Sequence, residues 1–141
     1  MSAKGIRDID VIRTFVLQGT LNFTRYFFKI RQKRKFVIGK HHREIAAALD
    51  KVLCGEITRL IINIAPRYGK TELAVKNFIA EGLAINPKAK FIHLSYSDDL
   101  ARDNSRGVQD IINEPEYRRI FPATIPTSTN TKKWYTTEGG G

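Results

Sequence analysis

Glycine, lysine and threonine stand side by side in one short segment, which runs Pro66-Arg67-Tyr68-Gly69-Lys70-Thr71. The segment follows a β-branched run and precedes residues with helical periodicity, so it falls where a strand would turn into a helix. Gly69 permits close approach of the backbone, the Lys70 ammonium can reach the β- and γ-phosphates of a nucleotide, and the Thr71 hydroxyl can hold Mg²⁺. Backbone N–H groups at such a turn face an anion at the positive end of the helix. The segment therefore predicts a phosphate loop for ATP and Mg²⁺.

Two features of this segment bear on the prediction. The usual phosphate-loop pattern has a glycine where this chain has Ile64, and a bare Gly-Lys-Thr is also compatible with an ordinary helix start whose lysine faces solvent. Arg67 has two interpretations as well. Its planar guanidinium could neutralise charge on a phosphoryl group during transfer, or it could lie on a solvent-facing loop.

Helices and strands that would position this loop follow from the apolar spacing. Three helices are expected first, near residues 7–18, 21–34 and 41–54, the last ending at Gly55. Strands at 59–65 and 90–95 then alternate with helices at 70–85 and from Asp98 or Asp99, as the cap, to Asn113. This alternation is typical of an α/β fold with a parallel sheet. The tail from Pro122 is expected to be loop, with an edge strand possible at Lys132–Thr137.

The formal charge of +10 is concentrated at the front of the chain. Residues 1–43 hold eleven Lys and Arg against two Asp, a net of +9, which leaves +1 for the other residues. Phe23, Phe27 and Ile30 form one apolar stripe on the expected helix and are predicted to be core. The basic cluster that follows has three interpretations: a solvated helix face, a contact to nucleic-acid phosphates, or a membrane-surface or targeting role. Its candidate DNA or partner contacts are Arg31, Lys33, Arg34 and Lys35.

Size and composition set outer limits. A chain of 141 residues with 42% hydrophobic content predicts one modest domain. The single cysteine, Cys54, excludes an internal disulfide and is expected to be buried. No apolar run reaches the length of a membrane span, so no membrane association through a spanning helix is expected.

The stretch from Gly55 to Glu72 resembles the deviant Walker A region of tailed-phage terminase large subunits, in which a Pro-Arg-aromatic-Gly-Lys-Ser/Thr loop follows an aliphatic strand. This variant accounts for the missing glycine. A second similarity lies in Phe91–Ser97 with Leu100-Ala101 and, further on, Tyr117–Pro122. The resemblance covers about residues 36–141.

The resemblance implies a partial P-loop NTPase of the additional-strand ATPase type, with a parallel sheet. Residues 1–43 would be a basic helical lead-in, and residues 44–141 the N-terminal part of the ATPase domain. Arg67 and Lys70 would be catalytic, and Thr71 would bind Mg²⁺. The cofactor-binding set would be Pro66, Arg67, Tyr68, Gly69, Lys70 and Thr71. The family's upstream segment approaches the adenine where this chain has His41, His42 and Arg43, although paired histidines at a helix start are more often surface or capping residues.

In the family, the complete protein couples ATP hydrolysis to the translocation of double-stranded DNA into the procapsid. The resemblance thus implies a ring homo-oligomer that works with the portal and the small terminase subunit in the cytoplasm of the infected host. The acidic Walker B strand would come after Trp134–Thr137 and the nuclease domain later still. Hydrolysis by this sequence alone is therefore left open and is not expected at a motor's rate.

Two alternatives remain from the sequence. The chain could belong to a helicase-like DNA motor ATPase, which further helicase motifs would reveal. It could also be a short stand-alone basic module that binds DNA, and such a module would not be stabilised by ATP and Mg²⁺.

Overall fold

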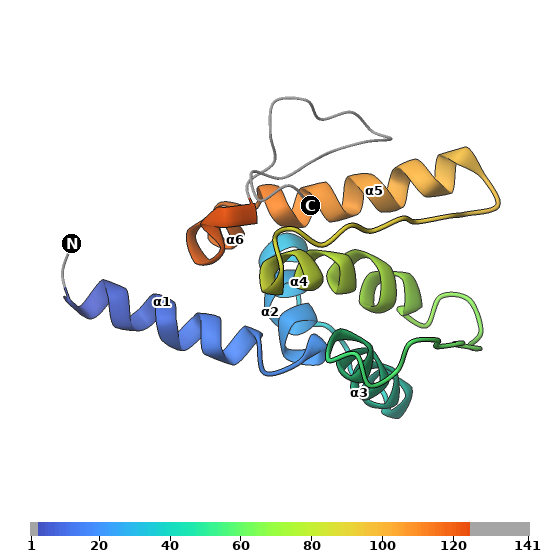
Figure 1. Ribbon diagram of the computed structural model, residues 1–141, viewed down its shortest axis with the longest axis horizontal. Helices are drawn as coiled ribbons and strands as arrows, with labels where there is room; N and C mark the ends of the chain where they lie inside the picture. Colours follow the sequence, from blue (N-terminus) through green and yellow to red (C-terminus); the bar gives the residue numbers. More distant parts are fainter. Residues whose placement is uncertain (1–2, 125–141) are drawn as a thin grey trace.

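The structure, a computed structural model, describes residues 3–124. Figure 1 shows their course. Three helices come first, as the apolar spacing predicts: α1 (Ala3–Val16), α2 (Thr20–Gln32) and α3 (Lys40–Leu53). They are followed by the π-helix η1 (Glu72–Asn77), α4 (Phe78–Ile85), α5 (Asp98–Asn113), α6 (Pro115–Ile120) and the short 3₁₀ turn η2 (Pro122–Thr124). The possible edge strand at Lys132–Thr137 lies outside the described residues.

The predicted α/β fold with a parallel sheet is wrong. Helix accounts for 66% of the structure, and residues 3–124 contain no strand. The segment 59–65 does have the side-chain alternation of an extended chain: Ile62 and Ile64 pack inward beside Leu73, while Ile61 is 85% exposed. An extended segment becomes a strand only when a neighbour pairs with its backbone. No backbone hydrogen bond joins residues 59–65 to residues 90–95, so no sheet forms.

The second predicted strand, 90–95, is likewise an extended segment with alternating side-chain exposure and no strand partner within residues 3–124. Ile92 and Leu94 are 88% and 85% exposed, while His93 between them is half-buried and its Nε2 lies 3.0 Å from Asn104 Nδ2. Figure 1 shows this segment running back from the end of α4 to the start of α5. The η1–α4 helix and α5 therefore run in the same direction. Extended segments and helices thus alternate along the chain as predicted, but no hydrogen-bonded ladder joins the extended segments.

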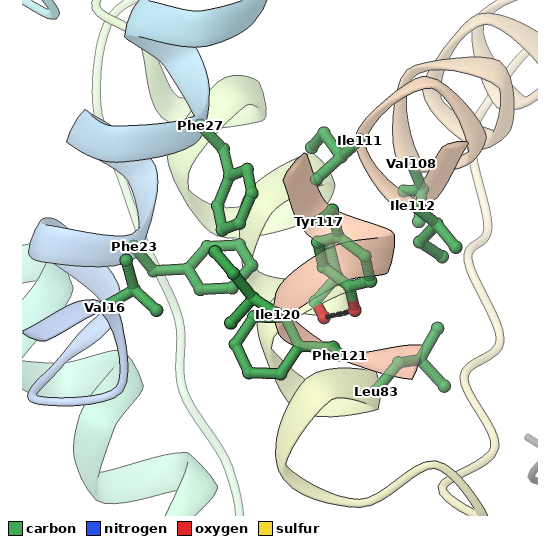
Figure 2. Close-up of a cluster of buried hydrophobic side chains, with 11 residues drawn as sticks. Val16, Phe23, Phe27, Leu83, Val108, Ile111, Ile112, Tyr117, Ile120 and Phe121 are labelled. Carbon is green, nitrogen blue, oxygen red and sulfur yellow. Dashed lines mark hydrogen bonds between the residues drawn. The ribbon is translucent and has the colours of Figure 1, made fainter. Parts of the chain in front are cut away.

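The main core forms where α2, α4, α5 and α6 meet (Figure 2). Phe23 and Phe27 are completely buried, which confirms the apolar stripe predicted on α2, and both rings contact Tyr117. The Tyr117 hydroxyl donates a hydrogen bond of 2.7 Å to the carbonyl of Ala80, so its polar end is satisfied inside the core. The other members of this cluster are Val16, Ala80, Leu83, Val108, Ile111, Ile112, Ile120 and Phe121.

This core takes residues from both sides of the predicted boundary at residue 43, which itself falls inside α3. A smaller cluster of Ile45, Leu49 and Leu73 joins α3 to η1. Because that cluster also contacts Ile62 and Ile64, it fixes the path of the chain into the segment that begins at Pro66.

Helix ends differ in detail from the prediction. Gly55, with φ of 79°, follows the end of α3 as expected, but Cys54 beside it is exposed rather than buried. The cap of α5 is Ser97, whose hydroxyl accepts from the Leu100 N–H at 3.2 Å, and not Asp98 or Asp99. Both aspartates lie in the first turn of α5, where a negative charge is favourable next to the helix dipole.

Candidate phosphate-binding site

The segment predicted to be a phosphate loop forms a tight turn directly before a helix. Arg67 has φ of 69° and Gly69 has φ of 74°, so the turn contains two left-handed residues with Tyr68 between them. For a non-glycine residue such as Arg67 that conformation is strained, and strain of this kind concentrates at functional sites. The turn brings the chain into the helix that starts at Lys70 and continues through η1 and α4.

Two structural features require a glycine at position 69. The left-handed φ is one. The other is space: a Cβ on Gly69 would lie 2.8 Å from Nε2 of His42 and 3.4 Å from Cζ of Phe36. The glycine identified by its motif is therefore also packed against the ring of a residue from α3.

The helix start presents free backbone donors. Its first hydrogen bond runs from the N–H of Leu73 to the carbonyl of Gly69, at 3.0 Å. The N–H groups of Lys70, Thr71 and Glu72 precede that bond and point out of the helix end, where the dipole is positive. Lys70 is half-buried and Thr71 is exposed. An anion at this position would meet backbone donors, an ammonium group and a hydroxyl.

The rest of the loop is open to solvent. Pro66 and Arg67 are exposed, and Tyr68 is 54% exposed. A hollow of about 350 Å³ lies elsewhere, between the end of α2 and the α5–α6 junction. None of the residues 66–71 lines it. The candidate site is thus an exposed turn and not a closed cavity.

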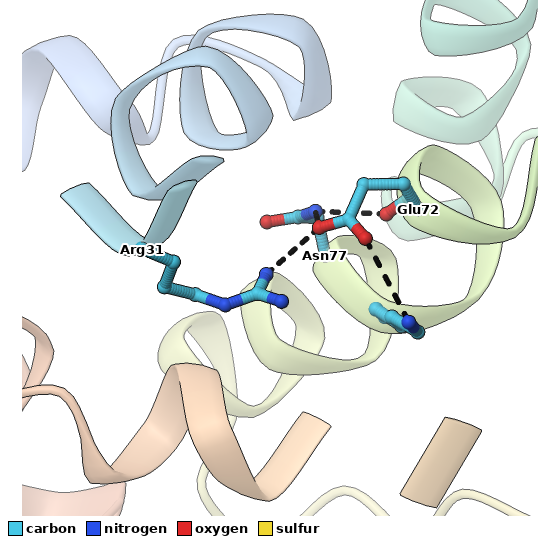
Figure 3. Close-up of polar contacts among 4 residues, drawn as sticks. Arg31, Glu72 and Asn77 are labelled. Atoms are coloured by element: carbon cyan, nitrogen blue, oxygen red, sulfur yellow. Dashed lines mark hydrogen bonds and ion pairs between the residues drawn. The ribbon is translucent and has the colours of Figure 1, made fainter. Parts of the chain in front are cut away.

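Glu72, the first residue of η1, is the centre of a polar network that sequence reasoning missed (Figure 3). Its Oε1 lies 2.7 Å from Nη1 of Arg31 and 3.0 Å from Nδ2 of Asn77. Its Oε2 lies 3.8 Å from Nζ of Lys76. Asn77 also donates to the backbone carbonyl of Glu72 at 2.8 Å, across the wide turn of the π-helix. A π-helical turn is itself frequent at functional sites.

Arg31 is therefore separated from the other predicted DNA contacts. Its side chain is only 9% exposed and is paired with Glu72, whereas Lys33, Arg34 and Lys35 are exposed. The Arg34 guanidinium lies 5.8 Å from the centre of the Phe28 ring, a cation–π contact that leaves the charge accessible. The basic surface that the structure brings together consists of residues 33–35. Helical spacing alone could not separate Arg31 from it, because its partner is 41 residues away.

Two histidines of α3 reach the loop. Nε2 of His42 lies 2.8 Å from the Tyr68 carbonyl oxygen, and Nε2 of His41 lies 3.3 Å from the same atom. His42 is buried, and its ring stands edge-on to Phe36, with 4.9 Å between ring centres. Burial lowers the pKa of His42, the hydrogen bond to Tyr68 raises it in part, and His41 lowers it further. Burial and the neighbouring His41 favour a neutral imidazole, and the hydrogen bond to Tyr68 opposes them only in part.

The aspartates at the start of α5 lie in the first turn of that helix. Asp98 pairs with Arg102 at 3.3 Å one turn along its own helix, and Asp99 is exposed. The carboxylate nearest to the loop in sequence is Glu72, which Arg31 and Lys76 already engage.

Comparisons with known proteins assign no function to these residues. No family model matches the chain, and no curated protein or solved structure matches it either. Across the described part of the chain, every helix falls short of the length and apolarity that a membrane crossing requires.

Proposed function

We propose that the loop Pro66–Thr71 binds the phosphates of ATP together with Mg²⁺. The observation that carries the proposal is the turn itself: left-handed φ values at Arg67 and Gly69 lead directly into a helix whose first N–H groups are free. An ordinary helix start does not require a strained, left-handed arginine two residues before a left-handed glycine. The motif residues and the conformation agree with phosphate binding.

The residues present fit such a ligand. At Gly69 no Cβ obstructs the backbone, the Lys70 ammonium would neutralise the β- and γ-phosphates, and the Thr71 hydroxyl would hold Mg²⁺. The bound metal would offset negative charge between the phosphates. Arg67 would bring a guanidinium to the γ-phosphate, and Pro66 and Tyr68 complete the turn. Because the loop is exposed and no cavity encloses it, we expect the affinity to be weak.

The wider function follows from the resemblance to tailed-phage terminase large subunits. In that proposal the complete protein couples ATP hydrolysis to translocation of double-stranded DNA into the procapsid, as a ring with the portal and small subunit in the host cytoplasm. The exposed residues 33–35 support a contact to DNA phosphates. These same residues favour a second candidate, a basic DNA-binding module that binds no nucleotide.

Calorimetric titration with ATP and Mg²⁺ distinguishes the two candidates. We expect binding to the intact chain, weakened about tenfold or more by Lys70→Ala through loss of a charge-assisted contact. Lys88→Ala is the matched control, because Lys88 is an exposed lysine after α4. Equal binding by all three proteins, or none, would reject the phosphate-loop proposal and leave the DNA-binding module.

Phosphate release in the same samples tests catalysis. Glu72 is held by Arg31 and Lys76, so it is not expected to orient an attacking water. We therefore expect binding without turnover at a motor's rate. Rapid turnover that Lys70→Ala abolishes would show that a carboxylate of this chain is catalytic.

A further inference from the structure

We propose that His42 is a positioning residue, which holds the turn Arg67–Gly69 in its anion-binding shape by linking the start of α3 to the Tyr68 carbonyl. The inference rests on the proposed function, because His42 would position the same phosphate-binding loop. It adds a residue outside the motif, 26 positions upstream of Tyr68.

The hydrogen bonds of His42 define its tautomer. The N–H of Gly39 can only donate, and it lies 2.9 Å from Nδ1 of His42, so Nδ1 must accept. In a neutral imidazole the proton then sits on Nε2. That nitrogen lies 2.8 Å from the Tyr68 carbonyl oxygen and donates to it. One ring thus caps α3 on one side and holds the loop on the other.

The position of this bond matters because Tyr68 lies between the two left-handed residues, Arg67 and Gly69. The Tyr68 carbonyl belongs to the peptide unit between Tyr68 and Gly69. Fixing this carbonyl therefore restrains the backbone that connects the two left-handed residues. The His42 ring also fills the space beside Gly69, and Phe36 packs edge-on behind it. A loop restrained in this way has its N–H groups aligned before a phosphate arrives, which reduces the entropy lost on binding.

Only the neutral ring can make both bonds. A second proton on Nδ1 would face the N–H of Gly39, so two donors would oppose each other. His41 is the titratable group against His42, with its Nε2 at 3.1 Å, and a charge on both rings would be repulsive. The other neighbours, Gly39, Phe36 and the backbone of Tyr68 and Gly69, carry no charge. Acidification should therefore break the bond to Gly39 and detach the ring from the start of α3, although Nε2–H can still donate to Tyr68.

A simpler role for His42 is that of a buried histidine that only caps α3. Two substitutions separate the roles. His42→Asn carries its amide near the Nδ1 position, so it can accept from Gly39 but cannot reach Tyr68. His42→Gln is longer, is a normal capping residue at the third position of a helix, and can both accept from Gly39 and donate to Tyr68. His41→Asn is the control for the neighbouring ring.

The first measurement is NMR on the intact chain without ligand. We expect ¹⁵N shifts of His42 that report a proton on Nε2, and a Gly69 amide that is ordered in the wild type and in His42→Gln. In His42→Asn this amide should become mobile on the nanosecond timescale while the α3 amides stay ordered. A proton on Nδ1, or an equally ordered Gly69 in His42→Asn, would overturn the proposal.

The second measurement is calorimetric titration with ATP and Mg²⁺. Affinity should fall about tenfold in His42→Asn, the equivalent of one hydrogen bond lost, and return in His42→Gln. Acidification from pH 8 to pH 5, which ends well below the ordinary histidine pKa of 6.5, should weaken binding by the wild type more than by His42→Gln. Equal affinity in Asn and Gln variants would contradict the role of His42. If no protein binds ATP, the proposed function fails and the NMR result alone decides whether His42 shapes the loop.

Discussion

The guanidinium of Arg31, in the last turn of α2, lies 2.7 Å from the carboxylate of Glu72, the residue that follows Thr71. This contact ties the basic front part of the chain to the helix that the candidate loop begins. The side chains of Arg31 and Glu72 are 9% and 16% exposed, so neither charge is well hydrated. An ion pair in such surroundings costs more to break than one at the surface.

Replacing Arg31 by Gln should therefore destabilise the fold. Loss of one partner leaves the Glu72 carboxylate with the neutral amide of Asn77, at 3.0 Å, and the more distant ammonium of Lys76, at 3.8 Å. We expect the free energy of unfolding to fall by about 3 kcal/mol, the lower end for a broken buried pair. Urea denaturation measures it. Arg25→Gln, an exposed arginine of the same helix, should stay within about 0.5 kcal/mol of the wild type, and equal effects would contradict the role of the ion pair.

Residues 33–35 should behave in the opposite way. Lys33, Arg34 and Lys35 are exposed, so their joint replacement by Gln should leave stability nearly unchanged and weaken duplex DNA binding. The slope of log affinity against log salt should fall by about 3, because each lost phosphate contact removes about 0.9. Filter binding over a salt series gives the slope. The pair Lys88→Gln and Lys90→Gln serves as the control, and an unchanged slope would assign residues 33–35 to a solvated face.

The sequence predicted the helices up to Asn113 because each has its own apolar periodicity, whereas the short helix α6 (Pro115–Ile120) was not predicted. Phe23 and Phe27, four residues apart, mark the buried face of α2, and their burial follows from helical geometry alone. The strands at 59–65 and 90–95 were wrong for a physical reason. Apolar β-branched residues favour an extended chain, but a sheet needs paired backbones, and local sequence does not say whether a pairing partner is present.

The candidate site also contains residues that local sequence could predict and contacts that it could not. Gly69, Lys70 and Thr71 are contiguous, so their motif could be recognised from residue order, and the turn before the helix agrees with it. The contacts of Glu72 and His42 could not be read from residue order, because their partners lie far along the chain; the sequence indicated His42 only as an adenine contact or a surface or capping residue. The one available signal was Gly39 three residues before His42, the spacing of a helix cap whose third residue bonds back.

The aromatic core makes a direct stability prediction. Phe27 is completely buried between α2 and α6 and contacts Phe23, Tyr26 and Tyr117. Phe27→Ala should lower the free energy of unfolding by about 3 kcal/mol or more, through lost burial and the cavity left behind. Phe15→Ala is the matched control because Phe15 is 42% exposed. Similar losses for both would show that Phe27 is not part of the core.

A buried carboxyl in the interface of α2 and α4 gives the chain a pH-dependent stability. Glu81 is 1% exposed, and its Oε2 has no hydrogen-bond partner within residues 3–124. Burial is the main cause that raises the pKa of Glu81 from 4.5 to about 7; the neighbouring Thr20 lowers it, and the carboxylate of Asp50 raises it further. The folded state therefore holds this proton more tightly than the unfolded state does between these two values.

The sign of the effect follows directly. Stability from the protonated Glu81 is fully present below pH 4.5 and is lost as the pH rises to about 7, a loss of about 3 kcal/mol for this shift. Glu81→Gln has no such titration, so its stability relative to the wild type should rise between pH 5 and pH 8 by most of that amount. His42 acts in the opposite direction at low pH, because its pKa is lowered, but it is present in both proteins and cancels in the difference. Urea denaturation of both proteins at pH 5, 6, 7 and 8 measures this difference. A difference that stays constant with pH would mean that Glu81 titrates normally and that water reaches its carboxylate in the folded protein.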